Sequence, residues 1–482
     1  MCWPAAKKFA SDLLLPSSVW AEQLGRDDIP SFVSSLRAAH PDIEIGEEKE
    51  LLCAETYEHE AALRGELETQ SRDLYVLVLR TDRDIVGGTI IEYDADENTV
   101  VGRMSFVSSS VRGLGLGRAL LRVQKSLAIA RGAQSTWGLV ELDNPAQTRL
   151  IRSEGFWLCG LVPECDQRRF PDGTMQYVAE ALYVMPLLGN EDLIWPDPGV
   201  LTDDVRALFS LLRLPGSPFV ESGLLPRPAR RKALPRLSPS VRHQLALRPE
   251  GTWPSASRLC DPSEVPTEFR IRQQARRDIP FLVNHLATWH PQLQLGSHRG
   301  FLLPEWYEQK VALHAEDQRI ERKPCFSLVI EHDDQIVGLF VVSSDFPCIT
   351  LTCELAVMNP RFQGRGVISA LMPFALRLCE ALDAETLLSF ATLRHPHAQR
   401  IAQRCGLELW GVLPAAEVLA NRDGRTQRGF DAVYGISLLP SKRARWPDPD
   451  MLSDDLRTLV RFVRDQRAED SLADKEEPTT DR

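Results

Sequence analysis

Apolar and polar positions along this chain follow two periods, and together they predict an α/β protein. Apolar runs typical of buried strands occur in two series, at residues 74–79, 84–93 and 100–107 and at residues 326–330, 335–343 and 349–358. Helical patterns precede the two series, at residues 27–65 and 277–320. Each half of the chain is therefore predicted to form helices first and a sheet afterwards.

A glycine-rich loop follows the third strand of the first series, and a long helix follows the loop. The loop lies in SVRGLGLGRALL, which begins at Ser110. One apolar stripe at helical spacing is formed by Leu116, Leu120, Val123, Leu127 and Ala130. Gly132 is expected to end this helix. A strand at 136–142, a short helix and closing strands near 180–188 complete the predicted order.

The second half of the chain repeats the first at an offset of 251 residues. WPDPGVLTDDVRALFSLL begins at Trp195, and WPDPDMLSDDLRTLVRFV begins at Trp446. The same offset relates Gly155 to Gly406, Gly160 to Gly411, and Tyr183 to Tyr434. Nearer the N-terminus the offset is 250, as between His40 and His290. A repeat of this length predicts a duplicated domain and not a solenoid unit.

The repeat and the local composition predict two domains and a linker. We expect a first domain at 18–215, a Pro/Arg/Ser-rich linker at 216–261, a second domain at 262–465 and a disordered acidic tail at 466–482. Each W-P-D-P segment is expected to start an appended helix, with Thr202 or Ser453 as its N-cap. We expect each appended helix to pack against its own domain.

Charge and cysteine usage narrow the functional classes. The formal net charge is −11 and no long basic run is present, which argues against a nucleic-acid partner. The ten cysteines form no C-x-x-C pair, which favours reduced thiols in a cytoplasmic protein. Neither a signal peptide nor a segment of transmembrane length is evident, so no membrane partner is expected.

The glycine loop is the main candidate for a binding site. A strand, a glycine loop and a helix direct several backbone N–H groups and the positive end of the helix toward one point, which predicts an anion site. The loop lacks the lysine of an ATPase P-loop. It also follows a late strand and not the first strand of a βαβ unit, which argues against a dinucleotide fold.

Two motifs in order resemble the GCN5-related N-acetyltransferase superfamily. Arg112, Gly115 and Gly117 fit its acyl-CoA loop pattern, [QR]-x-x-G-x-[GA]. Asn144 and the Gly155-Phe156 pair fit its second motif. The resemblance implies two tandem domains, each a mixed, mostly antiparallel sheet flanked by helices, with a splayed parallel strand pair between which an amine attacks the thioester. It implies that acyl-CoA is held in the first copy by Val107, Arg112, Gly113, Gly115, Gly117, Arg118 and Asn144.

The second copy fits the loop pattern in two registers. Arg361 matches by letters alone, whereas the repeat offset aligns Gln363 with Arg112. The resemblance implies that Met358, Gln363, Gly364 and Gly366 contact the cofactor in this copy. The register set by the repeat places Ile368 where the family has Gly or Ala, and we expect this side chain to crowd the pyrophosphate. The first copy is therefore expected to be the better acyl-CoA site.

Candidate catalytic groups differ between the copies. Relatives often use a carboxylate on the strand before the loop as general base. Glu354 occupies that place in the second copy, and Arg103 occupies it in the first. Glu141, on the strand before Asn144, is an alternative base in the first copy. Each of these carboxylates has a plain structural interpretation, as an ordinary strand or surface residue.

The tyrosine that relatives often use as general acid is missing from both copies. Ile151 and Ala402 stand at its position. A thiolate leaving group has a pKa of only about 8.5, so catalysis is weakened but not excluded. His395 and His397 suggest a metal pair, but no Cys or carboxylate lies at ligand spacing, and no metal is expected.

The leading hypothesis is an acyltransferase that moves an acetyl or other short acyl group from acyl-CoA to an amine. The resemblance to tandem members of the superfamily implies that one copy is active and the other structural. Two alternatives remain: a non-catalytic acyl-CoA sensor, favoured by Arg103 and the missing tyrosine, and an aminoacyl transferase that uses aminoacyl-tRNA. The sequence does not name the amine.

Overall fold

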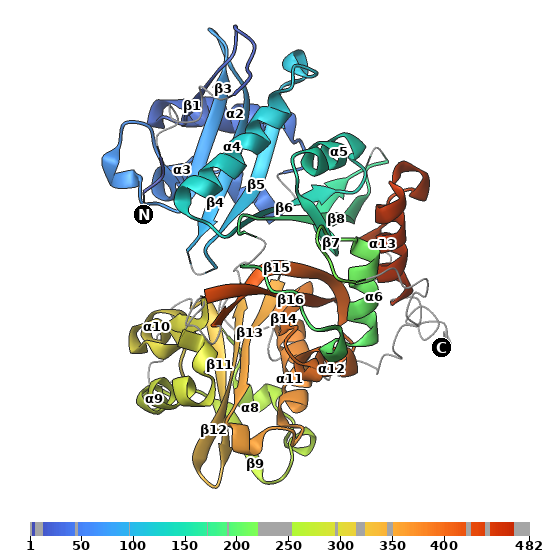
Figure 1. The fold of residues 1–482 in the computed structure, drawn as a ribbon. Coiled ribbons are helices and arrows are strands. Elements are labelled where there is room, and N and C mark those ends of the chain that lie inside the picture. The colour runs from blue at the N-terminus through green and yellow to red at the C-terminus, as the bar shows by residue number, and fades with distance from the viewer. Residues whose placement is uncertain are drawn as a thin grey trace, which may run out of the picture.

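A computed structural model describes residues 2–4, 13–43, 47–95, 97–170, 172–189, 192–219, 253–294, 297–314, 323–344, 350–420, 426–438 and 444–466. Most of the expected linker and nearly all of the expected acidic tail lie outside these residues. Two similar α/β halves follow one another along the chain (Figure 1). The predicted α/β class and the duplication are both confirmed.

The first half contains five helices and eight strands among the described residues. Its strands are β1 (Trp20–Gln23), β2 (Ala61–Ala62), β3 (Leu74–Arg80), β4 (Ile85–Asp94), β5 (Thr99–Val107), β6 (Ser135–Glu141), β7 (Trp157–Arg169) and β8 (Met175–Pro186). Its helices are α2 (Ile29–Ala39), α3 (Ala54–Glu60), α4 (Leu116–Arg131), α5 (Pro145–Ser153) and α6 (Asp203–Leu212). The strands pair in the order β3-β4-β5-β6-β8-β7, with β1 and β2 both on the outer edge of β3.

The second half repeats this arrangement. Its strands are β9 (Phe269–Gln273), β10 (Val311–Ala312), β11 (Cys325–His332), β12 (Gln335–Ser344), β13 (Thr350–Met358), β14 (Thr386–Thr392), β15 (Glu408–Ala420), β16 (Thr426–Ser437) and β17 (Ala444–Arg445). Its helices are α8 (Ala256–Leu259), α9 (Ile279–Trp289), α10 (Pro304–Lys310), α11 (Val367–Leu382), α12 (Pro396–Arg404) and α13 (Asp454–Asp465). The strands pair in the order β11-β12-β13-β14-β16-β15, with β9 and β10 on β11.

Each sheet is mostly antiparallel, with one parallel pair at its centre. Strands β5 and β6 run parallel and pair only as far as Gly102 and Gly138, although both strands continue. Strands β13 and β14 behave identically and pair only as far as Cys353 and Ser389. The splayed parallel pair implied by the family resemblance is therefore present in both copies.

Strands β3 and β4, and their equivalents β11 and β12, are buried on both faces over most of their length. Along β3, Tyr75, Leu77 and Leu79 pack with helix α4, whereas Val76 and Val78 pack with α2 and α3. Strand alternation places successive side chains on opposite faces, so a continuous apolar run is the expected sequence for such a strand. The predicted stripe of α4 is buried except at Ala130, which is exposed.

A tryptophan near the start of each copy extends both domains beyond the expected boundaries. The indole N–H of Trp3 donates to the carbonyl oxygen of Arg72 at 2.6 Å, and that of Trp253 donates to Lys323 at 2.8 Å. Trp3 lies against Tyr75, and Trp253 lies against the equivalent Phe326. We therefore propose that the second domain begins at residue 253, and that the first includes the Trp3 segment.

The two sheets meet where β7 and β15 cross. Gly160 pairs with Gly411, its own repeat equivalent, so the local two-fold axis passes through this contact. A Cβ on Gly160 would lie 2.6 Å from the Cα of Gly411, and a Cβ on Gly411 would lie 2.8 Å from the carbonyl oxygen of Cys159. Only glycine permits the strands to approach this closely at both positions.

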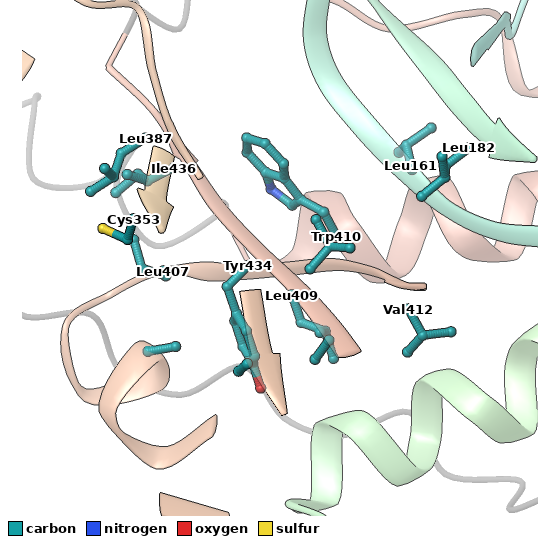
Figure 2. Packing of buried hydrophobic residues seen from close by; sticks show 14 of the residues in the cluster. Leu161, Leu182, Cys353, Leu387, Leu407, Leu409, Trp410, Val412, Tyr434 and Ile436 are labelled. Atoms are coloured by element: carbon teal, nitrogen blue, oxygen red, sulfur yellow. The ribbon is translucent and has the colours of Figure 1, made fainter. Parts of the chain in front are cut away.

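Apolar residues fill the space around the crossing. Figure 2 shows Leu161 and Leu182 of the first half near Trp410 and Val412 of the second, and all belong to one buried cluster that spans both halves. Trp410 is fully buried, and its indole N–H donates to Glu408 at 2.9 Å. The two halves therefore share one hydrophobic core and are not two separately packed domains joined only by a linker.

The W-P-D-P segments contact both halves, so the expectation that each packs on its own domain is correct only in part. Trp195 stacks on Trp157 of its own half and also lies against Phe430 of the other half. Leu193 pairs with Arg428 of β16, and in the mirror contact Ala444 of β17 pairs with Tyr177 of β8. The backbone N–H of Thr202, the N-cap of α6, donates to the side chain of Gln399 on α12 at 2.9 Å. Figure 1 shows α6 and α13 side by side at this boundary.

An ion pair joins α13 to the first half. Arg152 on α5 contacts Asp455 on α13 at 2.5 Å. The sequence predicted each appended helix and its N-cap from local signals. It did not predict the surface of the other half that these helices contact, because that surface lies about 200 to 300 residues away in the chain and no local pattern encodes it. No helix among the described residues is long and apolar enough to cross a membrane.

Candidate active site

The two glycine loops have the same backbone conformation. Gly113 and Gly115 have φ values of +83° and +79°, and Gly364 and Gly366 have values of +78° and +84°. These angles lie in the left-handed region that glycine adopts without strain. A Cβ built at any of the four would meet no other atom within 4 Å, so the space above each loop is open.

Matching hydrogen bonds fix the register of the two loops. Arg112 Nε donates to the carbonyl oxygen of Val107 at 3.3 Å, and Gln363 Nε2 donates to that of Met358 at 3.3 Å. Gln363, and not Arg361, is thus the structural equivalent of Arg112. The register chosen from the repeat offset is the one in the structure.

The loops end at the N-termini of α4 and α11, where donors face the loop. The first intrahelical bonds run from Ala119 N–H to the Gly115 carbonyl and from Ala370 N–H to the Gly366 carbonyl, each at 3.2 Å. N–H groups ahead of these bonds have no partner within the helix. Together with the helix dipole, they fit a phosphate or pyrophosphate group.

Gly117 in the first copy and its equivalent Ile368 in the second both lie where the long helix packs against its neighbours. A Cβ on Gly117 would meet Leu150 on α5 at 3.4 Å. Ile368 is partly buried and packs against the main core cluster, as does Ile401, the equivalent of Leu150. A side chain at position 117 would therefore contact the neighbouring helix. This contact does not test whether Ile368 crowds the pyrophosphate, and that expectation stays a prediction.

Two further residues expected at the cofactor have partners within the protein. Arg118 Nε contacts Glu154 Oε1 at 3.0 Å, and Arg122 Nε contacts Glu154 Oε2 at 2.9 Å. Asn144 is the N-cap of α5, where its side-chain oxygen accepts from the Gln147 N–H at 3.1 Å. Asn144 therefore orders the backbone, and Arg118 is ion-paired with Glu154.

A β-bulge lies where each parallel pair begins to splay, and it presents the candidate base position. The ladder between β4 and β5 skips Arg103, and the ladder between β12 and β13 skips Glu354. Bulges direct a side chain out of the regular alternation and are common next to active sites. The bulge residue is a cation in the first copy and a carboxylate in the second.

In the first copy, three carboxylates surround the cation. Arg103 Nη2 lies 2.6 Å from Glu48 and 2.8 Å from Glu50, and Arg103 Nη1 contacts Glu92. These contacts satisfy the guanidinium, whose pKa is raised by Glu48 and Glu92 against the opposing effect of burial. A guanidinium held in this way does not accept a proton at any ordinary pH.

In the second copy, a serine hydroxyl contacts the bulge carboxylate. The Ser343 hydroxyl donates to Glu354 Oε1. Burial lowers the pKa of His298, and the neighbouring Glu354 opposes that effect in part. The bulge of the second copy thus presents a carboxylate next to the splayed strands.

Glu141, the alternative base, is ion-paired. Arg168 on β7 contacts Glu141, and also approaches Asp143 at 3.6 Å. A carboxylate held by a guanidinium is a weaker base than an unpaired one. The ion pair with Arg168 therefore counts against Glu141 as a general base.

The closing strands carry a pair of carboxylates in each copy, which the sequence analysis missed. Burial, reinforced by Asp166, raises the pKa of Glu180 to about 7. Burial, reinforced by Glu417, raises the pKa of Asp431 to about 8. The repeat offset of 251 relates Asp166 to Glu417 and Glu180 to Asp431, and comparison of the two copies at that offset would have revealed both pairs.

The positions of the missing tyrosine and of the histidine pair are also described. Ile151 and Ala402 are both buried and apolar, so neither offers a proton to a leaving group. The rings of His395 and His397 lie 5.3 Å apart. Among the described residues, no group of three or more His, Cys, Asp or Glu is arranged to hold a metal ion.

The acetyltransferase (GNAT) family model matches the chain twice, at residues 42–156 and 291–407. Each match contains one glycine loop, one β-bulge and one splayed strand pair. The chain therefore belongs to the GNAT family and carries two of its domains in tandem.

Solved structures of acetyltransferases are similar to parts of the chain. A ribosomal-protein-alanine N-acetyltransferase from Brucella melitensis is 22% identical, with a TM-score of 0.29, over 35% of this chain and 99% of that chain. An IAA acetyltransferase from Bacillus cereus is 16% identical, with a TM-score of 0.27, over 35% of this chain and 100% of that chain. A putative acetyltransferase from Salmonella typhimurium, solved with acetyl-CoA, is 18% identical, with a TM-score of 0.28, over 36% and 96%. No curated protein matches the chain.

Proposed function

We propose that this protein transfers an acetyl or other short acyl group from acyl-CoA to the amine of a small molecule or protein. Membership of the GNAT family and two open loops with helix N-termini behind them support acyl-CoA as the donor. The loop N–H groups would hold the pyrophosphate, and the splayed strands would receive the thioester. Direct attack in a ternary complex then needs no covalent enzyme intermediate.

The observation that carries the assignment of chemistry is the bulge carboxylate of the second copy. In our proposal the amine nitrogen attacks the thioester carbonyl, Glu354 takes the amine proton, and the carbon–sulfur bond breaks to release the thiolate of CoA. The thiolate leaves without an acid because its pKa is only about 8.5. General-base assistance of this kind contributes roughly 10²- to 10⁴-fold.

The sequence alone favoured the first copy as the acyl-CoA site, because its loop keeps the complete glycine pattern. We propose that this copy also binds acyl-CoA but does not turn it over. Arg103 occupies the place of the base and is held by Glu48, Glu50 and Glu92. The alternative hypothesis for the whole chain was a non-catalytic acyl-CoA sensor. We propose this role for the first copy alone.

Matched changes in the two loops test this division. Acetyl-CoA is supplied with a panel of primary amines, and release of CoA is followed, while calorimetry counts the acetyl-CoA bound per chain. Gly366→Trp should abolish turnover and remove one binding site. Gly115→Trp should remove the other site and leave turnover in place. If only Gly115→Trp lost turnover, the first copy would be the catalytic one. If the wild-type protein transferred no acyl group, the proposed function would be refuted.

A further inference from the structure

A histidine ends the first long helix of each copy, and the backbone places both histidines in the same way. His40 is the C-cap of α2, with φ −126° and ψ 80°, and His290 is the C-cap of α9, with φ −138° and ψ 79°. The backbone N–H of His40 donates to the Leu36 carbonyl at 2.9 Å, and that of His290 donates to the Leu286 carbonyl at 2.8 Å. Neither ring has a role in the reaction proposed above.

Both rings reach the strand that precedes the glycine loop, but they bind different carbonyl groups. His40 Nε2 donates to the Ser105 carbonyl of β5 at 3.2 Å, and His290 Nε2 donates to the Met358 carbonyl of β13 at 2.9 Å. Because a carbonyl oxygen only accepts, the ring nitrogen carries the hydrogen in both contacts. Burial lowers the pKa of both histidines, which favours the neutral ring. The repeat offset of 251 relates Ser105 to Ala356, so the two contacts differ by two residues along the strand.

These carbonyl groups face the opening between the splayed strands. Ser108 N–H donates to the Val86 carbonyl of β4 at 2.8 Å, and Asn359 N–H donates to the Val337 carbonyl of β12 at 2.7 Å. Alternate residues of an antiparallel ladder face the partner strand, so the residues between them direct their backbone groups to the other side. On that side the parallel pairing has already ended. We call the gap-facing groups next to the glycine loops the outer carbonyls, at Val107 and Met358, and those next to the bulges the inner carbonyls, at Ser105 and Ala356.

The two histidines bind different members of this set. The outer carbonyl accepts a hydrogen bond from the loop in both copies, from Arg112 or from Gln363. His290 joins Gln363 at the outer carbonyl of the second copy, and Gln292 Nε2 lies 3.3 Å from His290 Nδ1 and holds the ring there. His40 instead binds the inner carbonyl of the first copy, which lies about 7 Å nearer the bulge.

We propose that these histidines set how far the arm of acyl-CoA enters each opening. This inference rests on the proposed function. The arm carries two amide groups, and an extended amide chain adds to a free strand edge through main-chain hydrogen bonds. In the second copy the arm bonds to the inner carbonyl at Ala356, two residues from Glu354, and brings the thioester to the base. In the first copy His40 already occupies the inner carbonyl at Ser105, so the arm stops nearer the glycine loop.

Calorimetry of acetyl-CoA binding at one site at a time tests the proposal. Gly366→Trp isolates the first site of the full chain, and Gly115→Trp isolates the second. In the Gly366→Trp background, His40→Ala frees the inner carbonyl, and we expect acetyl-CoA to bind about 2- to 10-fold more tightly, the usual effect of one neutral hydrogen bond. His40→Gln keeps a side-chain donor and should retain the original affinity. In the Gly115→Trp background, the matched change His290→Ala should not tighten binding.

The control ligand is 3′-phospho-ADP, the nucleotide part of CoA, because it carries the pyrophosphate and lacks the arm. Its affinity should be the same with and without His40→Ala, which also shows that the variant is folded. If His40→Ala does not bind this ligand, His40→Phe takes its place, since phenylalanine keeps a ring without an N–H. The same gain in acetyl-CoA affinity is expected of that variant.

Three results would each overturn the proposal. They are a folded His40 variant without a donor that binds acetyl-CoA no more tightly than the Gly366→Trp parent, an equal gain for 3′-phospho-ADP, and the same gain for His290→Ala in the second copy. Each of these results leaves the proposed function untouched. If the wild-type protein binds neither ligand, the proposed function is refuted, and the inference about the histidines falls with it.

Discussion

At the residue scale, the bulge position separates the two copies. Arg103 and Glu354 stand at the same place in the same fold, but Arg103 contacts three carboxylates, whereas Glu354 accepts a hydrogen bond from the Ser343 hydroxyl. The sequence identified both residues from their distance to the glycine loop. It did not identify the acidic partners of Arg103, because Glu48 and Glu50 lie more than fifty residues away in the chain and contact the bulge only through the fold.

Reversing the charge of Arg103 tests whether its ion pairs with the surrounding carboxylates stabilise the first copy. Arg103→Glu would place a fourth carboxylate beside Glu48, Glu50 and Glu92, and like charges at these distances repel. We expect the free energy of unfolding to fall by about 2 kcal/mol, within the usual range for a broken ion-pair network. Arg103→Lys keeps the charge and should cost less. Urea unfolding of the two variants measures the difference, and equal stability would contradict a structural role for the cluster.

The raised pKa of Asp431 makes a prediction about stability and pH. Its pKa is near 4 in the unfolded chain and about 8 in the fold, so between these values the folded state binds the extra proton. Stability from this group is therefore present at low pH and is lost as the pH rises toward 8. Asp431→Asn should stabilise the protein at pH 8.5 relative to pH 5 by about 1 kcal/mol or more, the equivalent of at least one pKa unit. Denaturant midpoints at the two pH values check this, and an identical change at both would contradict it.

At the element scale, the strand and helix order was predictable, whereas the interface between the sheets was not. Apolar runs indicated β3 and β4 because both of their faces are buried, and the stripe from Leu116 to Leu127 indicated α4. Gly160 and Gly411 were recognised only as repeated landmarks. Their physical reason, a backbone crossing between two distant strands, appears only when both halves are assembled.

Adding a side chain at the crossing should separate β7 from β15. A Cβ at position 160 would lie 2.6 Å from both the Gly411 Cα and the Trp410 carbonyl oxygen, so one strand must move. Gly160→Ala is expected to cost about 1–3 kcal/mol of stability, the usual range for overpacking. Gly138→Ala is the matched control, because its Cβ would make only one contact, at 3.4 Å. Thermal unfolding of the pair tests this, and an equal melting temperature would show that the crossing tolerates a side chain.

At the scale of the whole molecule, the exchanged W-P-D-P segments make the halves depend on each other. Leu193 lies against β16 and Ala444 lies against β8, while α6 and α13 extend this exchange. The duplication was readable from the repeat, but the exchange was not, because an appended helix fits its own domain and its partner's equally well on local criteria.

Cleavage between the halves tests this dependence. A protease site introduced between residues 220 and 252 would cut the covalent connection while leaving the shared core in place. We expect the two fragments to co-elute as one species in size-exclusion chromatography and to unfold in one transition. Separate elution of two folded fragments would contradict the shared core.

The central claim is that the second copy performs the chemistry with Glu354. The most direct measurement compares kcat for acetyl transfer in Glu354→Gln and Glu141→Gln, the two carboxylates that the sequence proposed. The account predicts a loss of roughly 10²-fold or more in Glu354→Gln, with acetyl-CoA binding retained, and a kcat within about two-fold of wild type in Glu141→Gln. A Glu354→Gln enzyme with wild-type kcat, or a Glu141→Gln enzyme without activity, would contradict it.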